Sequence, residues 1–141
     1  MLKWDSEAFL NSVSEALDNR KQQLVANVDS ALELIHNTSN QFAPVDTGEM
    51  IDDSGYFTRL TSSQIIGTVG YMPFYSIYVH QGTGIYALNG DGRQISWFWY
   101  GGESGKWAGW HHTHGQRPKR FLYKAFLEYE DEINWILAEG V

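Results

Sequence analysis

Hydrophobic residues recur with a helical period at both ends of the chain and with a strand period between them. Over residues 6–37 the apolar positions are three or four apart, or their sum, which places them on one face of a long helix. They are Phe9, Val13, Leu17, Leu24, Val28, Ala31 and Ile35. Asp5 or Ser6 suits the N-cap, and the turn formers at 37–40 suit the end. We expect this helix to pack on a sheet; a coiled-coil seam is the alternative.

The segment at residues 43–48 is expected to be a rigid connector between this helix and a strand. Pro44 fixes its own φ and disfavours helical geometry at the residue before it. Asp46 and Thr47 are able to bond nearby backbone amides, and Gly48 permits a sharp turn. The chain is therefore expected to leave the helix abruptly at this point.

Alternation of apolar and polar residues predicts strands in the middle of the chain. The runs lie at residues 56–60, 64–71, 74–80 and 95–100. Because a short turn at 71–73 separates the second and third runs, we expect these two to form an antiparallel pair. The glycine-rich residues 101–105 would turn the fourth run back into a partner at 106–111.

A helical period returns after Pro118 and continues to about Ala138, with Gly140 just beyond as a stop signal. Its apolar face comprises Phe121, Leu122, Ala125, Phe126, Tyr129, Ile133 and Ile136. Helix, strands and helix follow one another without βαβ alternation. This order predicts an α+β fold, with the two long helices packed on a mostly antiparallel β-sheet and a long Gly-rich loop. We expect a single domain over residues 1–141.

The Gly-rich loop is the most unusual segment of the sequence. Gly82, Thr83 and Gly84 end the third strand-like run, and a polar stretch continues to the next apolar residue, Ile95. Glycine is used where the backbone needs positive φ or must lie close against another surface. Loops held on rigid scaffolds commonly carry function. For this loop we expect a function in protein–protein assembly.

Composition supports an assembly protein over a nucleic-acid-binding one. The 141 residues include six Trp and eight Tyr, more rings than one small core needs, and surplus Tyr and Trp often mark an interface. The net charge of −7 would repel DNA. The basic cluster comprises Arg117, Lys119, Arg120 and Lys124. A secretory signal and a membrane-spanning run are both missing from the sequence, so we expect a soluble protein made in a cytoplasm.

Catalytic and metal-binding motifs are weak in this chain. The histidine cluster consists of His111, His112 and His114, with His80 at the expected strand end. Converging imidazoles bind zinc or copper, but no Cys or His-Glu-x-x-His motif supports them here. Nucleophile-elbow, P-loop and dinucleotide motifs do not occur, and residues 89–92 lack the terminal Glu of a calcium loop. We expect no enzyme activity, cofactor or metal; a metal-dependent hydrolase remains the distant alternative.

Four segments follow one another in a fixed order. The first holds Pro44, Asp46, Thr47 and Gly48; the second holds Tyr75, Tyr78, His80, Gln81, Gly82, Thr83, Gly84, Ile85 and Tyr86; the third holds Asn89, Gly90, Asp91, Gly92, Arg93 and Trp97; the fourth holds Gly115, Pro118, Phe121, Leu122 and Ala125. Together they resemble the small tail-completion, or head–tail joining, proteins of long-tailed bacteriophages. The chain departs from that pattern at the acidic residues 49–54 and at Lys119 and Arg120.

The resemblance implies a structural virion protein at the phage neck, without catalysis. Copies would form a ring, with six-fold symmetry expected, around the channel that carries DNA, which passes without specific binding. The partners implied are sister copies, the head connector or adaptor proteins, and the tail terminator or tail tube protein. The loop at residues 82–92 and the aromatic run 95–100, with Trp97 and Trp99, would form the assembly interface. A tail terminator or a minor head protein of the same virion is the alternative.

Overall fold

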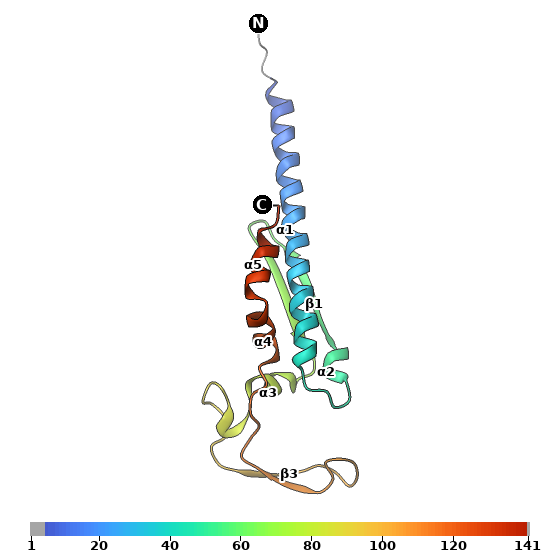
Figure 1. Cartoon of the computed structure of the whole chain (residues 1–141), viewed down its shortest axis with the longest axis vertical. Coiled ribbons are helices and arrows are strands. Elements are labelled where there is room, and N and C mark those ends of the chain that lie inside the picture. The colour runs from blue at the N-terminus through green and yellow to red at the C-terminus, as the bar shows by residue number, and fades with distance from the viewer. Residues whose placement is uncertain (1–4, 141) are drawn as a thin grey trace.

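Helices at both ends of the chain flank two small antiparallel sheets in the computed structural model, which describes residues 5–140 (Figure 1). The elements are α1 (Ser6–Phe42), α2 (Glu49–Asp52), β1 (Ser54–Leu60), β2 (Ile65–Tyr71), α3 (Ser76–Gln81), the 3-10 turn η1 (Gly84–Tyr86), β3 (Trp97–Tyr100), β4 (Trp110–Thr113), α4 (Phe121–Glu128) and α5 (Glu130–Ala138). The predicted α+β class is confirmed. The expected single sheet is instead divided, because β1 pairs with β2 and β3 with β4. Residues 1–4, part of the segment read for a secretory signal, lie outside the described residues.

The N-terminal half of α1 extends beyond the rest of the molecule (Figure 1). Asp5 is the N-cap, since its Oδ1 accepts a hydrogen bond of 3.0 Å from the Ala8 amide. The expected packing of this helix on a sheet is confirmed for its C-terminal half, which contacts β1 and β2, but it does not extend to residues 5–23, which are all exposed. The cause is length: 37 residues of helix span about 55 Å, whereas the seven-residue strands β1 and β2 span about 23 Å.

The C-terminal end of α1 runs through the turn formers at residues 37–40, so the predicted end is wrong. Ser39 is fully buried there, and its hydroxyl lies 2.7 Å from the hydroxyl of Tyr71 on β2. The Tyr71 hydroxyl in turn donates to Oδ1 of Asn40 at 2.5 Å. Burial raises the pKa of Tyr71, which keeps this donor protonated. Residues 37–40 locally prefer a turn, but their contacts with the sheet keep them helical.

The first sheet lies against the C-terminal half of α1. The strands β1 and β2 pair over their full length, from Ser54 opposite Tyr71 to Leu60 opposite Ile65. Gly67 on β2 lies close against the helix. A Cβ atom there would lie 2.7 Å from Cγ1 of Val28 and 2.9 Å from Cδ1 of Leu32. The helix can therefore sit close to the sheet only because residue 67 has no side chain.

The third strand-like run is a helix, α3, so both the predicted strand at residues 74–80 and its pairing with the second run are wrong. Tyr75 and Val79, four residues apart, both pack against the buried cluster of Ala43, Met50 and Phe121. Their spacing fits a helix turn as well as a strand, because the run is too short for periodicity to decide.

The C-terminal helix was expected to be continuous, but it is divided at Tyr129, where φ is −122° and ψ is 26°. The break gives α4 and α5, which both pack along α1 (Figure 1). Asn27 on α1 closes the far end of α5, since its Nδ2 donates to the Glu139 carbonyl at 2.7 Å and to the Leu137 carbonyl at 3.3 Å. Gly140 follows with φ +69°, as expected of a helix stop.

We predict that Gly67→Ala lowers the free energy of unfolding by about 1–3 kcal/mol, because the new methyl group has to displace Val28 or Leu32. Gly55→Ala on the paired strand is the matched control, since a Cβ there meets no atom within 4 Å. Urea denaturation of the two variants measures the difference. Equal free energies of unfolding for the two variants would contradict the close approach.

Candidate functional site

The packed part of the molecule, here called the body, consists of the C-terminal half of α1 with β1, β2, α4 and α5. Segments that are far apart in the sequence meet at one end of this body. The buried cluster there joins Ala43 from the connector and Phe121 from the fourth segment, with Tyr75, the N-cap of α3, and Val79 of α3 packed against it. The backbone continues this association, because the Val79 and His80 carbonyls accept hydrogen bonds of 3.0 Å from the amides of residues 119 and 120. The first, second and fourth segments of the ordered set therefore share one core.

A second set of backbone bonds fastens the loop at residues 82–92 to the start of the fourth segment. The Thr83 amide donates to the Gln116 carbonyl at 2.9 Å, and the Gln116 amide donates to the Thr83 hydroxyl at 2.8 Å. The Ile85 amide donates to the His114 carbonyl at 3.1 Å. We call this contact of residues 82–85 with residues 114–118 the glycine junction.

Glycines permit the junction because the two backbones touch. A Cβ on Gly84 would lie 2.0 Å from the His114 carbonyl oxygen, and one on Gly115 would lie 2.1 Å from the Thr83 carbonyl oxygen. Gly84 also has φ +61° and Gly115 φ +126°, where other residues are strained. Gly92 closes the loop, since its Cβ would lie 2.1 Å from the Gly84 carbonyl oxygen.

The junction changes which loop residues are available for contact. Gly82 and Gly84 are buried against their own chain, so they shape the loop and present no surface. The exposed positions of the loop are Ile85, Leu88, Asn89, Gly90 and Asp91. Tyr86 is half-buried, with the Arg117 guanidinium 4.8 Å from its ring centroid. The predicted interface function of this loop therefore rests on residues 85–91, and it stays a prediction.

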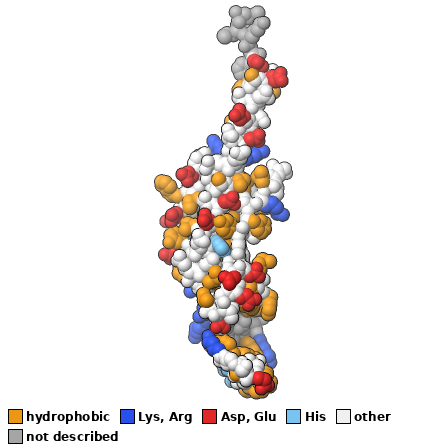
Figure 2. All heavy atoms as spheres, turned by 90° about the vertical axis from the view of Figure 1, so that its right-hand side faces the viewer, with side chains coloured by type: hydrophobic (Ala, Val, Ile, Leu, Met, Phe, Trp, Pro, Cys, Tyr) orange, Lys and Arg blue, Asp and Glu red, His pale blue; other side chains and the backbone are white. Residues whose placement is uncertain are grey.

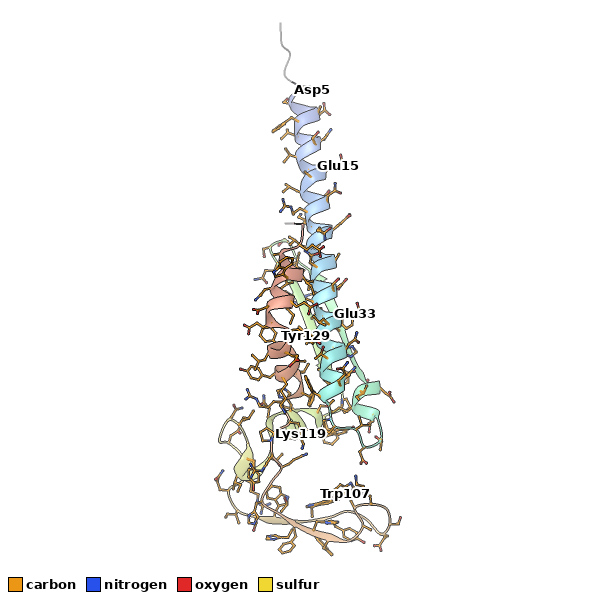
Figure 3. The ribbon with its side chains drawn as sticks, viewed as in Figure 1. Asp5, Glu15, Glu33, Trp107, Lys119 and Tyr129 are labelled. Atoms are coloured by element: carbon orange, nitrogen blue, oxygen red, sulfur yellow. The ribbon has the colours of Figure 1, made fainter. Side chains whose placement is uncertain are left out.

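The hairpin of β3 and β4, here called the arm (residues 97–113), runs crosswise below the junction, at the end of the molecule opposite the N-terminus (Figures 1 and 3). Trp99 stacks on His111 at 4.4 Å between ring centroids, and Phe98 stacks on His112 at 4.6 Å. β4 begins at Trp110, so the predicted partner run at 106–111 starts too early. Just beyond the strands, the Gly101 amide donates a hydrogen bond to the Gly109 carbonyl. Cross-strand ring pairs thus stiffen a hairpin of only four residues per strand.

The two faces of the arm differ in exposure. Trp97, Trp99, His111 and Thr113 are half-buried, on the face that turns toward Thr83 and Gln116 across a pocket of about 530 Å³. Phe98, Tyr100, Trp110 and His112 form the outer face, and Phe98 and Trp110 are 68% and 71% exposed. The sequence prediction covered the run 95–100, which includes Phe98, but singled out Trp97 and Trp99, which lie on the inner face, and it did not include Trp110; side-chain alternation along a strand was the available signal.

The connector meets the tip of the arm. Lys106 Nζ lies 3.5 Å from Asp46 Oδ1, but both side chains are about two-thirds exposed, so this pair adds little stability. Pro44, Gly48 and Trp107 line one hollow of about 290 Å³ with α2 and α3. Gly48 takes φ +84° as the N-cap of α2, which confirms the sharp turn expected there. The connector therefore leads out of α1, provides the N-cap of α2 and contacts the tip of the arm.

The histidine cluster does not converge. Alternation along β4 places His111 on the inner face and His112 on the outer one, and His112 contacts His114 ring to ring at 5.3 Å. His111 Nε2 lies 2.8 Å from the Trp107 carbonyl oxygen. Among residues 5–140, three or more His, Asp or Glu side chains do not gather in a way that could hold a metal ion. His111 and His112 instead stack on aromatic rings of β3, and His111 also makes a polar contact with the backbone.

His80 lies where α3 meets the first turn of α4. Its Nε2 accepts a 3.4 Å hydrogen bond from the Tyr123 amide, and its ring meets Phe121 edge to face at 5.0 Å. Burial, and secondarily the charge of Arg120, lowers the pKa of His80 below its ordinary 6.5. Arg120 itself has φ +48°, an unfavourable backbone for a side chain of this size. The turn into α4 is thus held by a neutral imidazole.

A cleft of about 500 Å³ opens beside this turn, between α3 and α4, with α1 and β2 behind it. Its lining is mostly apolar and includes Ile77, Leu122 and Phe126. Ser76 is 5% exposed in the cleft, and its hydroxyl has no hydrogen-bond partner among the described residues. A buried hydroxyl without a partner costs free energy, so Ser76 is a polar group inside an otherwise mostly apolar cleft.

Comparisons of this chain with protein-family models, with curated proteins and with solved structures return no match. Within residues 5–140, α1 and the other helices are either too short or too polar to cross a membrane.

We predict that Gly84→Ala disrupts the glycine junction. Gly90→Ala is the control, because Gly90 shares a positive φ of +70° but a Cβ there meets no atom within 4 Å. The control should cost about 1–2 kcal/mol of unfolding free energy from backbone strain alone. Gly84→Ala should cost about 3 kcal/mol or more and speed amide hydrogen exchange at Thr83 and Gln116. Similar costs and unchanged exchange would show that the junction tolerates a side chain.

We also predict that the protein loses stability as the pH falls from about 7 to about 5. The folded pKa of His80 is lowered, so the unfolded chain takes up the proton first and the proton favours unfolding. His80→Gln should flatten this part of the curve when the free energy of unfolding is measured by urea at several pH values. Parallel curves for the two proteins would contradict this prediction.

Proposed function

We propose that this protein is a structural subunit of a ring at the neck of a long-tailed bacteriophage, where it joins tail to head. The observation that carries the proposal is the meeting of the four ordered segments at one end of the body. Those segments resemble the tail-completion family, and in three dimensions they form one core, one junction and one arm. The contacts among these segments support the proposal because function resides in sites that residues form together, and the residues that carry the resemblance do lie together.

The arm and the exposed part of the loop at residues 85–91 are the proposed assembly surface. Phe98 and Trp110 expose large rings on an element held by the glycine junction, and aromatic anchors dominate protein interfaces. Figure 2 shows hydrophobic side chains gathered on the arm with basic side chains beside it, and acidic side chains on the projecting helix. Sister copies are the expected contact, followed by the head connector or adaptor and the tail terminator or tube protein.

The charge distribution agrees with a channel wall that does not hold DNA. The net charge is −7, and like charge keeps the polyanion from condensing on the protein. The proposed location is therefore the virion neck, after synthesis in the cytoplasm of a bacterial host. A tail terminator or minor head protein of the same virion would need the same ring geometry.

The experiment is removal of the gene from the phage, followed by electron microscopy of the particles. We expect full heads and separate tails that do not join, and restored joining when the wild-type gene is supplied. Normal joined particles without the gene would overturn the proposal.

In the same complementation we predict that Phe98→Ser with Trp110→Ser fails to restore joining, because the double change removes the exposed rings of the arm. Trp135→Ser is the matched control, since Trp135 is 82% exposed but lies on α5, away from the arm. It should restore joining as well as the wild type. Circular dichroism of both purified proteins checks that they are folded. Full joining by the double variant would show that the exposed rings of the arm are not needed for assembly.

A further inference from the structure

The projecting part of α1 is an amphipathic helix without cover in the single chain. Leu10, Val13 and Leu17 recur at intervals of three and four residues and therefore share one face. Leu10 is 63% exposed and Leu17 is 58% exposed, both in the half of α1 that runs beyond the body (Figure 1). An apolar stripe of this kind typically faces a partner, because packing of that stripe supplies most of the stability of a helix.

The projecting helix is also acidic. Residues 5–23, the exposed part of α1, contain the acidic residues Asp5, Glu7, Glu15 and Asp18 and the basic residues Arg20 and Lys21, a net charge of −2 with all the acidic residues on the N-terminal side. Figure 3 labels Asp5 and Glu15 along this part of α1 and Lys119 at the opposite end of the body. The surface that covers the stripe is therefore expected to combine apolar lining with basic residues at its edge.

The cleft between α3 and α4 has both properties. Its lining is apolar, and Ile77 remains 60% exposed and Phe126 40% exposed at its mouth. Two basic residues lie beside the cleft: the Arg120 guanidinium is 4.1 Å from the ring centroid of Tyr123, which lines it, and Lys124 is exposed on α4, which forms one wall. Of the rest of the basic cluster, Arg117 lies instead over the Tyr86 ring of the loop. The buried Ser76 hydroxyl, which has no partner among the described residues, is a polar group inside the cleft that an incoming chain would satisfy.

We propose that the projecting half of α1 docks in the α3–α4 cleft of a second copy of this chain. The helix and the cleft lie at opposite ends of the molecule (Figure 1), and α1 is one continuous helix, so a chain cannot fill its own cleft. The contact is therefore heterologous: one surface on one copy meets a different surface on the next, and repetition of it gives a ring or a filament. An amphipathic helix seated in an apolar groove is a recurrent mode of recognition.

This contact specifies how neighbouring copies would meet in the proposed ring. It depends on the proposed function only for the closure of the repeated contact into a ring. The arm lies at the same end of the molecule as the cleft (Figure 1), so the incoming helix of one neighbour and the outer face of the arm would belong to one continuous assembly surface. The pairwise contact itself does not depend on the phage assignment and is tested with purified protein.

The test is a disulfide cross-link between two introduced cysteines. Native thiols cannot compete, because the chain contains no cysteine. Leu17→Cys supplies the helix and Ile77→Cys supplies the cleft, and the two variants are mixed under mild oxidation. Phe57→Cys on β1 is the matched control, since Phe57 is 61% exposed against 60% for Ile77. We expect the Leu17–Ile77 cross-link to form roughly tenfold faster or more than the Leu17–Phe57 one, because docking raises the effective concentration of the thiols.

Two further results follow from the charges and from the direction of the contact. Lys124→Glu in the Ile77→Cys chain should slow the cross-link, and added salt should slow it too. Leu17→Cys alone should form few self-linked dimers. Equal rates for Ile77 and Phe57, or a self-linked Leu17 dimer as the main product, would overturn the proposal; the second result would indicate pairing of α1 with α1. Cross-linking together with joined particles in the gene-deleted phage would retain the contact and reject the neck assignment.

Discussion

The length of α1 is the constraint on which the rest of the structure depends. A helix of about 55 Å runs beside strands of about 23 Å and two short helices, so the chain has enough other residues to cover only part of it. The covered part organises the body: it receives the first sheet at Gly67, caps α5 through Asn27 and bonds Tyr71 through Ser39 and Asn40. The other part is left as an exposed acidic helix.

At the opposite end of the body, backbone contacts hold a second exposed feature in place. The glycine junction brings residues 82–85 against residues 114–118 at distances that exclude a side chain at Gly84 or Gly115. From this junction the arm extends with its aromatic outer face uncovered. A molecule with an uncovered helix at one end and an uncovered aromatic surface at the other is suited to heterologous association, in which each copy contributes a different surface to each neighbour. That property links the fold to the proposed place in a ring.

Sequence periodicity predicted the elements that are long or strictly alternating. The face of α1, the strand ending at Tyr71 and the aromatic run through Trp97 and Trp99 are all present. The helix α3 was mistaken for a strand because Tyr75 and Val79 satisfy both periods over so short a run. The end of α1 was placed too early because Ser39 and Asn40 have tertiary partners on β2 that local preference does not reveal.

The glycines of the candidate site could be recognised from the sequence, but the contacts that they make within the chain could not. Gly82 and Gly84 indicated close approach or positive φ, and both occur, whereas Gly115, which was named only as part of the fourth segment, has the same properties. Their partners could not be read from the sequence, because the contact joins residues about 30 positions apart through backbone atoms. The exposure of Leu17 could not be predicted either, because periodicity identifies an apolar face but does not show whether another element covers it.

Amide hydrogen exchange, measured on the wild-type protein at a dilute and at an assembling concentration, tests most directly whether both ends of the molecule take part in association. Assembly should slow exchange in residues 5–23 and in residues 117–126 together, while β1 changes little. Exchange in residues 5–23 that stays equally fast at both concentrations, although the protein has assembled, would contradict the account.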